Sequence, residues 1–133
     1  MDPHAKDTGP AADRSADRRA AERLGLDAED RAAAALVARG WAVLDRRVRT
    51  GVGELDLVAE RRGLLAFVEV KARASLAEAA ASLSRRQQIR LMAAAEAWLA
   101  VHPGHGARGM RFDVILVAPE GMRRVTDAFR AWE

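Results

Sequence analysis

Four charged side chains interrupt a stretch that otherwise reads as two buried β-strands, between Gly53 and Arg73. The four are Glu54, Asp56, Glu69 and Lys71. Charges inside apolar strand sequence are costly to bury unless opposite charges, hydrogen bonds or a metal ion compensate them. Carboxylates that converge there with a lysine predict a site for a divalent cation and a phosphate.

The expected strands place these charges on particular faces, because side chains alternate along a strand. One face of the first strand carries Glu54, Asp56 and Val58, and the other carries Leu55, Leu57 and Ala59. In the second strand, Phe67, Glu69 and Lys71 share a face. Residues 61–63, Arg-Arg-Gly, are suited to the turn between the two strands.

A hairpin in which Glu60 lies opposite Leu65 brings the charges together. Asp56 then lies opposite Glu69, and Glu54 lies opposite Lys71. Directly opposed Cβ atoms are about 4.5–5.5 Å apart, close enough for two carboxylates to share one cation. A slip of one residue would move the charges to the other face, so the register is itself a prediction.

Length and composition narrow the class of protein. A chain of 133 residues is long enough for one domain with a modest core. It contains no cysteine, which excludes disulfides and thiolate metal sites and fits a cytoplasmic location. No apolar run reaches the roughly 18 residues of a membrane span, so no membrane partner is expected. The net charge is only +3, which is weak support for a nucleic-acid partner.

The order of the expected elements indicates an α/β fold. Residues 1–18 lack an apolar period and are expected to form a disordered N-terminal arm, with a single domain over residues 19–133. The domain is expected to contain a helix over Ala20–Arg39, a strand over Trp41–Arg49, the hairpin, a helix from Ser82 or Ser84 to about Val101, and a strand over Met110–Ala118. This α-β-β-β-α-β order predicts a mixed central sheet flanked by helices. The segment from Met122 to Glu133 stays ambiguous.

Glu29 falls in the first expected helix, near the edge of its apolar stripe. It precedes Leu36 by seven residues, nearly two helical turns, so the two side chains point almost the same way. Taken alone, this position fits a solvated glutamate or an ion pair with Arg31 or Arg39.

The charges of the hairpin suit phosphodiester hydrolysis, in which a water is activated and charge builds on the phosphoryl oxygens. A hard divalent cation serves both needs and prefers oxygen ligands. Asp56 and Glu69 are suitable ligands, and the backbone carbonyl of Val70 is a third candidate. Mg²⁺ usually keeps several waters, so two carboxylates suffice. Lys71 is suited to orient the attacking water or to hold the phosphate.

The order of these motifs resembles that of the PD-(D/E)xK nucleases, a superfamily that includes restriction endonucleases and Holliday-junction resolvases. More closely, the chain resembles the YraN-like family of small uncharacterised bacterial proteins. The resemblance extends from Arg23 to Val117 and rests on the blocks GELDLVA, FVEVKAR and RFDV, which begin at Gly53, Phe67 and Arg111. Leu55 stands where the superfamily often has a proline before its first aspartate.

This resemblance implies a restriction-endonuclease-like fold and a nuclease core of Asp56, Glu69 and Lys71, with Mg²⁺ or Mn²⁺ as cofactor. It adds Glu29 as a further metal ligand, so this role and the ion-paired role are both open. The implied activity is hydrolysis of DNA phosphodiester bonds, branched DNA such as Holliday junctions included. Because resolvases cut two strands symmetrically, the resemblance also implies a homodimer. The alternative is a non-catalytic nucleic-acid-binding module, or an adaptor, that retains the nuclease fold.

Several basic or polar residues would border the same cleft in such a fold and contact DNA phosphates. They are Arg46, Arg47, Arg49, Arg73, Arg85, Arg86, Arg90 and Gln87. Contacts of this kind position a DNA backbone without reading its sequence. For any single arginine, an ordinary surface position is the alternative. Asp113, inside an apolar strand, is expected to pair with a basic residue and to be structural, and His102 and His105 are expected in a solvated loop.

Overall fold

The computed structural model describes residue 19 and residues 27–130, so the expected arm of residues 1–18 lies outside the described part. A helix over residues 27–38 comes first. It is followed by β1 (Ala42–Thr50), β2 (Gly53–Arg61), β3 (Leu64–Ala72), α2 (Leu76–Ala81), α3 (Arg85–Val101), β4 (Met110–Ala118) and β5 (Gly121–Phe129). This order confirms the expected α-β-β-β-α-β core, with α2 and β5 added to it. No helix of the described residues is long and apolar enough to cross a membrane.

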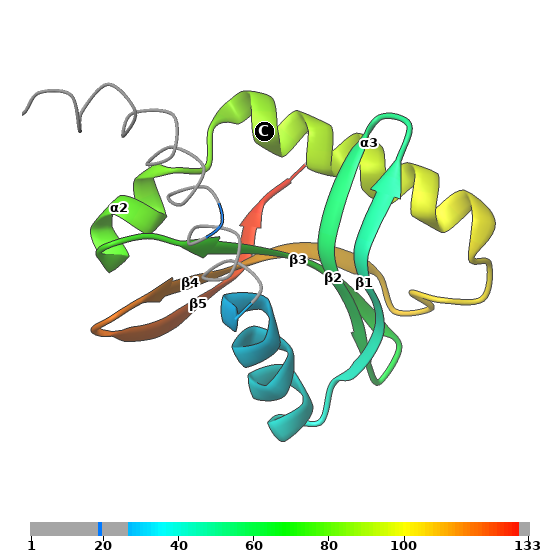
Figure 1. Ribbon diagram of the computed structural model, residues 1–133. Helices are drawn as coiled ribbons and strands as arrows, with labels where there is room; N and C mark the ends of the chain where they lie inside the picture. Colours follow the sequence, from blue (N-terminus) through cyan, green and yellow to red (C-terminus); the bar gives the residue numbers. More distant parts are fainter. Residues whose placement is uncertain (1–18, 20–26, 131–133) are drawn as a thin grey trace, which may run out of the picture.

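The five strands form one mixed sheet in the order β1-β2-β3-β4-β5. Neighbouring strands are antiparallel except β3 and β4, which are parallel and are joined by the crossover through α2 and α3. Helix 27–38 covers one face of the sheet, whereas α2 and α3 cover the other (Figure 1). The fold is therefore a three-layer α/β structure, consistent with a restriction-endonuclease-like core.

The hairpin has the predicted register, with Glu60 opposite Leu65. Its turn is tighter than expected, because Arg61 and Leu64 also pair and leave only Arg62 and Gly63 between the strands. Both turn residues have positive φ, 52° and 81°, as a type I′ turn requires. A two-residue turn fixes the strand register strongly, and the paired part of the hairpin ends at Leu57 and Val68, one residue before Asp56 and Glu69.

Gly40 supplies the backbone conformation that ends helix 27–38. Gly40 has a φ of 86°, and two backbone bonds close the last turn: Gly40 N–H to the Val37 carbonyl and Trp41 N–H to the Leu36 carbonyl, each 3.0 Å. This is a Schellman cap, which satisfies carbonyls that the helix leaves unpaired. The expected start at Ala20 lies outside the described residues. Ala28, Ala32, Ala33 and Leu36 supply the buried face.

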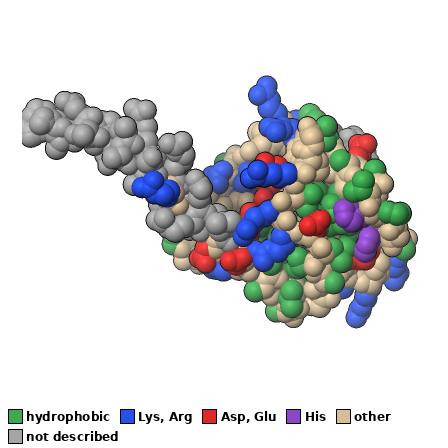
Figure 2. All heavy atoms as spheres, turned by 45° about the vertical axis from the view of Figure 1, so that its right-hand side comes forward, with side chains coloured by type: hydrophobic (Ala, Val, Ile, Leu, Met, Phe, Trp, Pro, Cys, Tyr) green, Lys and Arg blue, Asp and Glu red, His purple; other side chains and the backbone are tan. Residues whose placement is uncertain are grey.

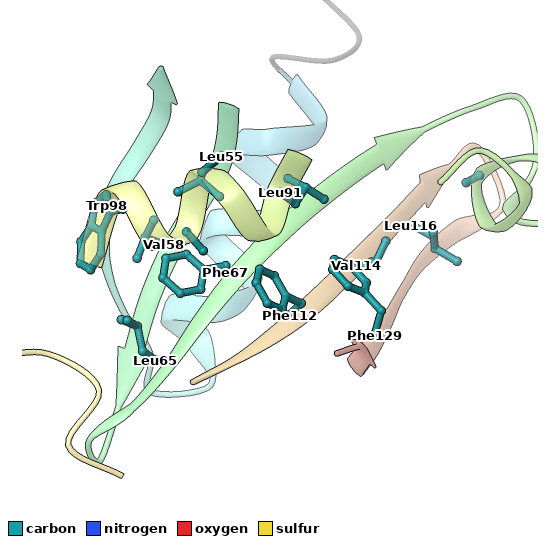
Figure 3. Close-up of a cluster of buried hydrophobic side chains, with 13 residues drawn as sticks. Leu55, Val58, Leu65, Phe67, Leu91, Trp98, Phe112, Val114, Leu116 and Phe129 are labelled. Carbon is teal, nitrogen blue, oxygen red and sulfur yellow. The ribbon is translucent and has the colours of Figure 1, made fainter. Parts of the chain in front are cut away.

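The second long helix begins at Ser84, one of the two expected caps. The Ser84 hydroxyl accepts from the Gln87 N–H, and the Gln87 side chain accepts in return from the Ser84 N–H. Such a capping box fixes the entry of α3. The apolar face of α3 then packs on the sheet around Phe67, which meets Trp98 edge to face with ring centroids 5.8 Å apart (Figure 3).

The strands β2 and β3 pair only as far as Leu57 and Val68, and beyond that point they separate (Figure 1). The simple alternation of faces fails at the same place. Leu55 packs in the cluster beneath α3 together with Val58, whereas Leu57 packs beneath helix 27–38. The expectation that Leu55 and Leu57 share a face is therefore wrong. Leu55 and Leu57 both stay paired with β1, opposite Val48 and Arg46, and the positive φ of Arg47 between these two partners marks an irregularity in β1 at this place.

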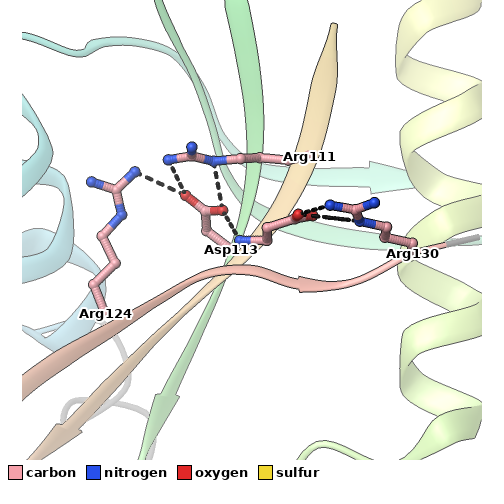
Figure 4. Close-up of polar contacts among 5 residues, drawn as sticks. Arg111, Asp113, Arg124 and Arg130 are labelled. Atoms are coloured by element: carbon pink, nitrogen blue, oxygen red, sulfur yellow. Dashed lines mark hydrogen bonds and ion pairs between the residues drawn. The ribbon is translucent and has the colours of Figure 1, made fainter.

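The C-terminal segment that the sequence left ambiguous forms the edge strand β5. Asp113 of β4 lies beside this strand and contacts residues of both β4 and β5 (Figure 4). The Asp113 side chain is fully buried and accepts hydrogen bonds from Arg111 (2.9 and 3.1 Å), Arg124 (2.8 Å) and the Asp127 N–H (2.9 Å). Asp113 thus has the basic partners that the sequence predicts for it, and its contacts are structural.

The two histidines of the loop after α3 are less exposed than a solvated loop implies. His102 stacks on Trp98, with centroids 4.1 Å apart, and His105 contacts Glu60 at 3.0 Å. Figure 2 shows the two described histidines (purple) beside hydrophobic side chains.

Candidate functional site

Asp56 and Glu69 meet where β2 and β3 separate. The Asp56 Oδ2 accepts from the Val70 N–H at 2.8 Å, and the Glu69 carboxyl group lies close enough to raise the pKa of Asp56 through its charge and hydrogen bonding. The Val70 N–H therefore bonds to a side chain rather than to the backbone of β2. Asp56 and Glu69 lie one residue beyond the last paired residues, Leu57 and Val68, so their carboxyl groups come together without the ladder pairing that the sequence predicts. For Val70 the structure gives this N–H contact, and the role of its carbonyl as a metal ligand stays a prediction.

The contact changes the protonation of the pair. The pKa of Asp56 is raised to about 8, first by burial and then by the charge of Glu69 and the hydrogen bond to it. The Val70 N–H and the Lys71 charge act in the opposite direction but are weaker. Two carboxyl groups in one site cannot both ionise cheaply, so the pair holds one proton at neutral pH without a cation.

Lys71 joins the site through Glu69, not through Glu54. Its Nζ lies 3.0 Å from Glu69 Oε2, and the two side chains are only 9% and 14% exposed. Because the β2–β3 ladder ends at Leu57, Glu54 is not paired across from Lys71, and the predicted opposition of these two residues is wrong. Glu54 is exposed but still lines the same pocket as Asp56 and Glu69.

Glu29 approaches the site from helix 27–38. It accepts a hydrogen bond from Arg47 Nε at 2.9 Å, so its basic partner is neither Arg31 nor Arg39 as considered from the sequence. Burial raises the pKa of Glu29, and the nearby Asp56 charge adds to this effect while Arg47 opposes it. Glu29 is thus both ion-paired and close enough to Asp56 to influence it. Within residues 27–130, no three His, Asp or Glu side chains are gathered as a metal-binding group.

A pocket of about 300 Å³ opens beside the carboxylates. Its lining consists of Glu54, Asp56 and Glu69 from the sheet, and Gln87, Arg90 and Leu91 from α3. Gly53 brings β2 close to α3, because a Cβ at this position would lie 2.7 Å from the Arg90 carbonyl oxygen. The pocket therefore has an acidic wall on the sheet and a polar wall on the helix.

Of the predicted nucleic-acid contacts, Gln87 and Arg90 line this pocket. Arg46 pairs with Asp30, Arg47 with Glu29, Arg73 donates to the Ala72 carbonyl, and Arg85 donates to Gln88. Arg49 and Arg86 are exposed. Figure 2 shows basic side chains mixed with acidic ones on one face of the molecule, rather than a separate basic patch. A DNA contact for each of these arginines stays a prediction.

Arg90 is a lining residue that the sequence named only together with Arg85 and Arg86, as one of the basic residues at the start of the second helix. A signal for it exists, since Gln87, Arg90 and Leu91 are spaced three and four residues apart and so lie on one face of α3. That spacing becomes informative only when Gln87 is already known to face the site.

Comparisons with known proteins cover this part of the chain. The sequence profile of the uncharacterised protein family UPF0102 matches residues 28–117, a range that includes Glu29, Asp56, Glu69, Lys71 and the whole pocket. A UPF0102 protein of Bradyrhizobium sp. (strain ORS 278) is 56% identical over 115 residues, which cover 86% of this chain and 82% of that protein.

Two further relatives give the same result. A UPF0102 protein of Granulibacter bethesdensis is 58% identical over 111 residues, which cover 83% of this chain and 70% of that protein. One of Rhodopseudomonas palustris (strain BisA53) is 51% identical over 117 residues, which cover 88% of this chain and 90% of that protein. The family resemblance expected from the GELDLVA and FVEVKAR blocks is confirmed, and the chain belongs to the uncharacterised protein family UPF0102.

Proposed function

We propose that this protein hydrolyses phosphodiester bonds in DNA with the help of Mg²⁺ or Mn²⁺. The observation that supports the proposal most is the contact between the Asp56 and Glu69 carboxyl groups, with Lys71 3.0 Å from Glu69. A structural ion pair would need only one carboxylate for this lysine. The second carboxyl group costs stability unless it serves a ligand.

The donor set fits a hard divalent cation. Asp56 and Glu69 offer carboxylate oxygens to the lining of a pocket, and Mg²⁺ accepts two carboxylates when waters complete its coordination. The absence of a three-residue cluster within residues 27–130 is compatible with this limited ligand set. When bound, the cation supplies a nucleophilic water and neutralises charge on the phosphate. Glu29 is proposed as an additional ligand that leaves Arg47 when the cation binds.

Lys71 has the role of a buried cation beside the reacting groups. Its ammonium group donates to Glu69, keeps that carboxylate in place and offers further N–H bonds to a water or a phosphoryl oxygen. Placed groups of this kind stabilise charge that develops in the transition state at no reorganisation cost. Loss of Lys71 is therefore expected to reduce cleavage more than it reduces DNA binding.

The substrate proposed is duplex or branched DNA. Branched DNA is favoured by the resemblance to resolvases, and symmetric cutting of two strands would require two copies of the chain. Size-exclusion chromatography with light scattering, in the presence of a four-way junction, tests the proposed homodimer.

The decisive experiment measures cleavage of linear duplex, single-stranded and four-way DNA with Mg²⁺ or Mn²⁺. Wild type is compared with Asp56→Ala and Lys71→Ala, and with Glu96→Gln, which removes an exposed carboxylate on α3. We expect cleavage by wild type and Glu96→Gln, and a loss of at least about 100-fold in the other two.

Two results would contradict the proposal. Equal activity in all four proteins would indicate a contaminating nuclease. No cleavage of any substrate at high protein concentration would refute catalysis. If DNA binding then persisted without metal, the protein would be a binding module that keeps the nuclease fold.

A further inference from the structure

The pocket beside the carboxylates has two chemically different walls. The sheet contributes Glu54, Asp56 and Glu69, which offer acceptors or a bound proton. Across from them, α3 contributes Gln87 and Arg90, which offer donors. The pocket volume, about 300 Å³, is at the lower end of the range for small-ligand sites, so it suits one phosphate group with its sugar rather than a base pair.

Arg90 differs from the other cations near the site. Lys71 is bound to Glu69, and Arg47 is bound to Glu29. In contrast, no hydrogen bond or ion pair engages the Arg90 side chain within the described part of the chain, although three acidic residues line the same pocket. A guanidinium that lines an acidic pocket without an acidic partner keeps all five N–H donors available for a ligand.

The Gln87 side chain is held so that it too offers donors. Its Oε1 accepts from the Ser84 N–H at 3.2 Å as part of the capping box, so the oxygen is used and the amide NH₂ remains. Gln87 and Arg90 are three residues apart and lie on the same side of the helix. The capping contact therefore orients one donor group, and the helix places the second beside it.

The distance between the two walls is fixed by backbone contact. The Gly53 α-carbon faces the Arg90 carbonyl so closely that a Cβ would lie 2.7 Å from that oxygen and 3.4 Å from the Ala94 Cβ. The start of β2 and the second turn of α3 thus pack without an intervening side chain. Glu54 follows Gly53 directly, so this packing also sets where the acidic wall begins.

The geometry points to Arg90, assisted by the Gln87 amide, as the substrate-positioning residue that holds the phosphate of a DNA strand on the α3 side of this pocket. The inference rests on the proposed function, because it gives the second contact of the phosphate that the Asp56–Glu69 pair would bind through a cation. Guanidinium groups bind phosphate oxygens in a bidentate manner, which fixes orientation as well as position.

The test separates binding from cleavage. Binding of labelled duplex and four-way DNA is measured by fluorescence anisotropy in the Asp56→Ala background, with EDTA and again with Mg²⁺. Into this background we introduce Arg90→Ala, Arg90→Lys or, as the control for loss of one positive charge, Arg123→Ala. Arg123 is exposed on the edge strand β5 and does not line the pocket.

Arg90→Ala should weaken DNA binding about tenfold and reduce the slope of log K against log salt by about 1. Arg90→Lys should recover part of the affinity, since a lysine supplies the charge but not the bidentate geometry. Arg123→Ala should change the affinity by less than about twofold. In the otherwise wild-type protein, Arg90→Ala should raise KM more than it lowers kcat. The circular dichroism spectrum and Tm of each variant check that α3 is intact.

Unchanged affinity in Arg90→Ala, or an equal loss in Arg123→Ala, would overturn the role of Arg90. These outcomes are distinct from failure of the proposed function. If wild type does not cleave DNA, the anisotropy measurements still decide whether Arg90 holds a phosphate. If wild type cleaves and Arg90→Ala behaves like wild type, only the assignment of Arg90 falls.

Discussion

The Val70 N–H donates to the Asp56 carboxyl group at 2.8 Å, at the position where the β2–β3 ladder has just ended. A side chain of β2 thus takes the place of a backbone acceptor. This hydrogen bond holds the Asp56 side chain at the point where β2 and β3 separate. It holds Asp56 in a largely buried position beside Glu69, where burial first and then the Glu69 carboxylate raise the pKa of Asp56, while the Val70 bond itself lowers it.

The raised pKa predicts that Asp56 destabilises the metal-free protein as pH rises. The pKa is about 8 in the folded protein against 3.8 for an unperturbed aspartate. Between these values the folded state binds the proton and the unfolded state does not, so the free energy of unfolding falls with increasing pH. Asp56→Asn removes this titration but keeps groups that can accept from Val70 and donate to Glu69. We expect it to stabilise the protein by more than about 1 kcal/mol at pH 8 and by much less at pH 4.5.

Thermal unfolding in EDTA at the two pH values measures this effect. Glu96→Gln, at an exposed carboxylate, is the control and should leave Tm unchanged at both. A stabilisation by Asp56→Asn that is the same at pH 4.5 and pH 8 would show that the gain does not come from the Asp56 proton.

Divalent cations are expected to offset, in the wild type, the loss of folding stability that Asp56 causes at higher pH. A cation that binds the ionised pair must displace the proton, so Mg²⁺ should raise Tm, more at pH 8.5 than at pH 6.5. At concentrations ten times above Kd the gain is about 1.4 kcal/mol, a few degrees for a domain of this size. Calorimetric titration in two buffers of different ionisation enthalpy measures the proton released. Asp56→Asn should lose the response, and no Tm shift in wild type at either pH would argue against a metal at this pair.

The sequence predicted that Asp56 and Glu69 come together, because the register and the turn of the hairpin are determined by neighbouring residues. The Arg62-Gly63 turn defines a register that pairs β2 and β3 up to Leu57 and Val68, and this pairing leaves Asp56 and Glu69 next to each other at its end. What the sequence did not predict depends on contacts distant along the chain. Arg47 reaches Glu29 across 18 residues, from a strand that has shifted register between Val43 and Asp45 and has positive φ at Arg47 itself. No periodicity indicates such an irregularity in advance.

Other elements were missed for different reasons. Ser75 caps the start of α2, since its hydroxyl accepts from the Glu78 N–H at 3.1 Å, and this Ser-x-x-Glu cap was readable in the sequence. Six residues are too few for a clear apolar period, however. β5 was ambiguous because it is an edge strand, and its charged and mostly exposed residues conceal the alternation that marks a strand with a buried face.

The close approach of Gly53 to Arg90 predicts a specific sensitivity to one added methyl group. In Gly53→Ala the new Cβ would meet the Arg90 carbonyl oxygen at 2.7 Å, so β2 or α3 must shift. Forcing atoms into a packed contact of this kind costs about 1–3 kcal/mol. Gly51→Ala is the matched control, since a Cβ at Gly51 meets nothing within 4 Å. Urea unfolding should show a lower midpoint for Gly53→Ala only. If Gly51→Ala is destabilised equally, the effect belongs to the β1–β2 turn and not to the contact with α3.

Asp113 provides a test of stability that is separate from the proposed site. Its buried carboxylate is bound by Arg111 and Arg124, and the guanidinium groups of these residues lie 5.4 and 5.0 Å from the Trp41 ring centre. Asp113→Asn leaves two guanidinium groups near an indole without their shared counter-charge. Breaking a buried ion pair in this way costs about 3–5 kcal/mol.

Asp127→Asn is the comparison for Asp113→Asn, because Asp127 is an exposed aspartate that pairs with Arg130. It has a φ of 53°, a conformation that asparagine also tolerates. Exposed ion pairs contribute at most about 1 kcal/mol, so this variant should unfold almost as wild type does. Urea unfolding monitored by tryptophan fluorescence measures both. Equal small losses would mean that the Asp113 cluster is compensated by other contacts, whereas a large loss in Asp113→Asn alone would establish it as the main polar anchor of β4 and β5.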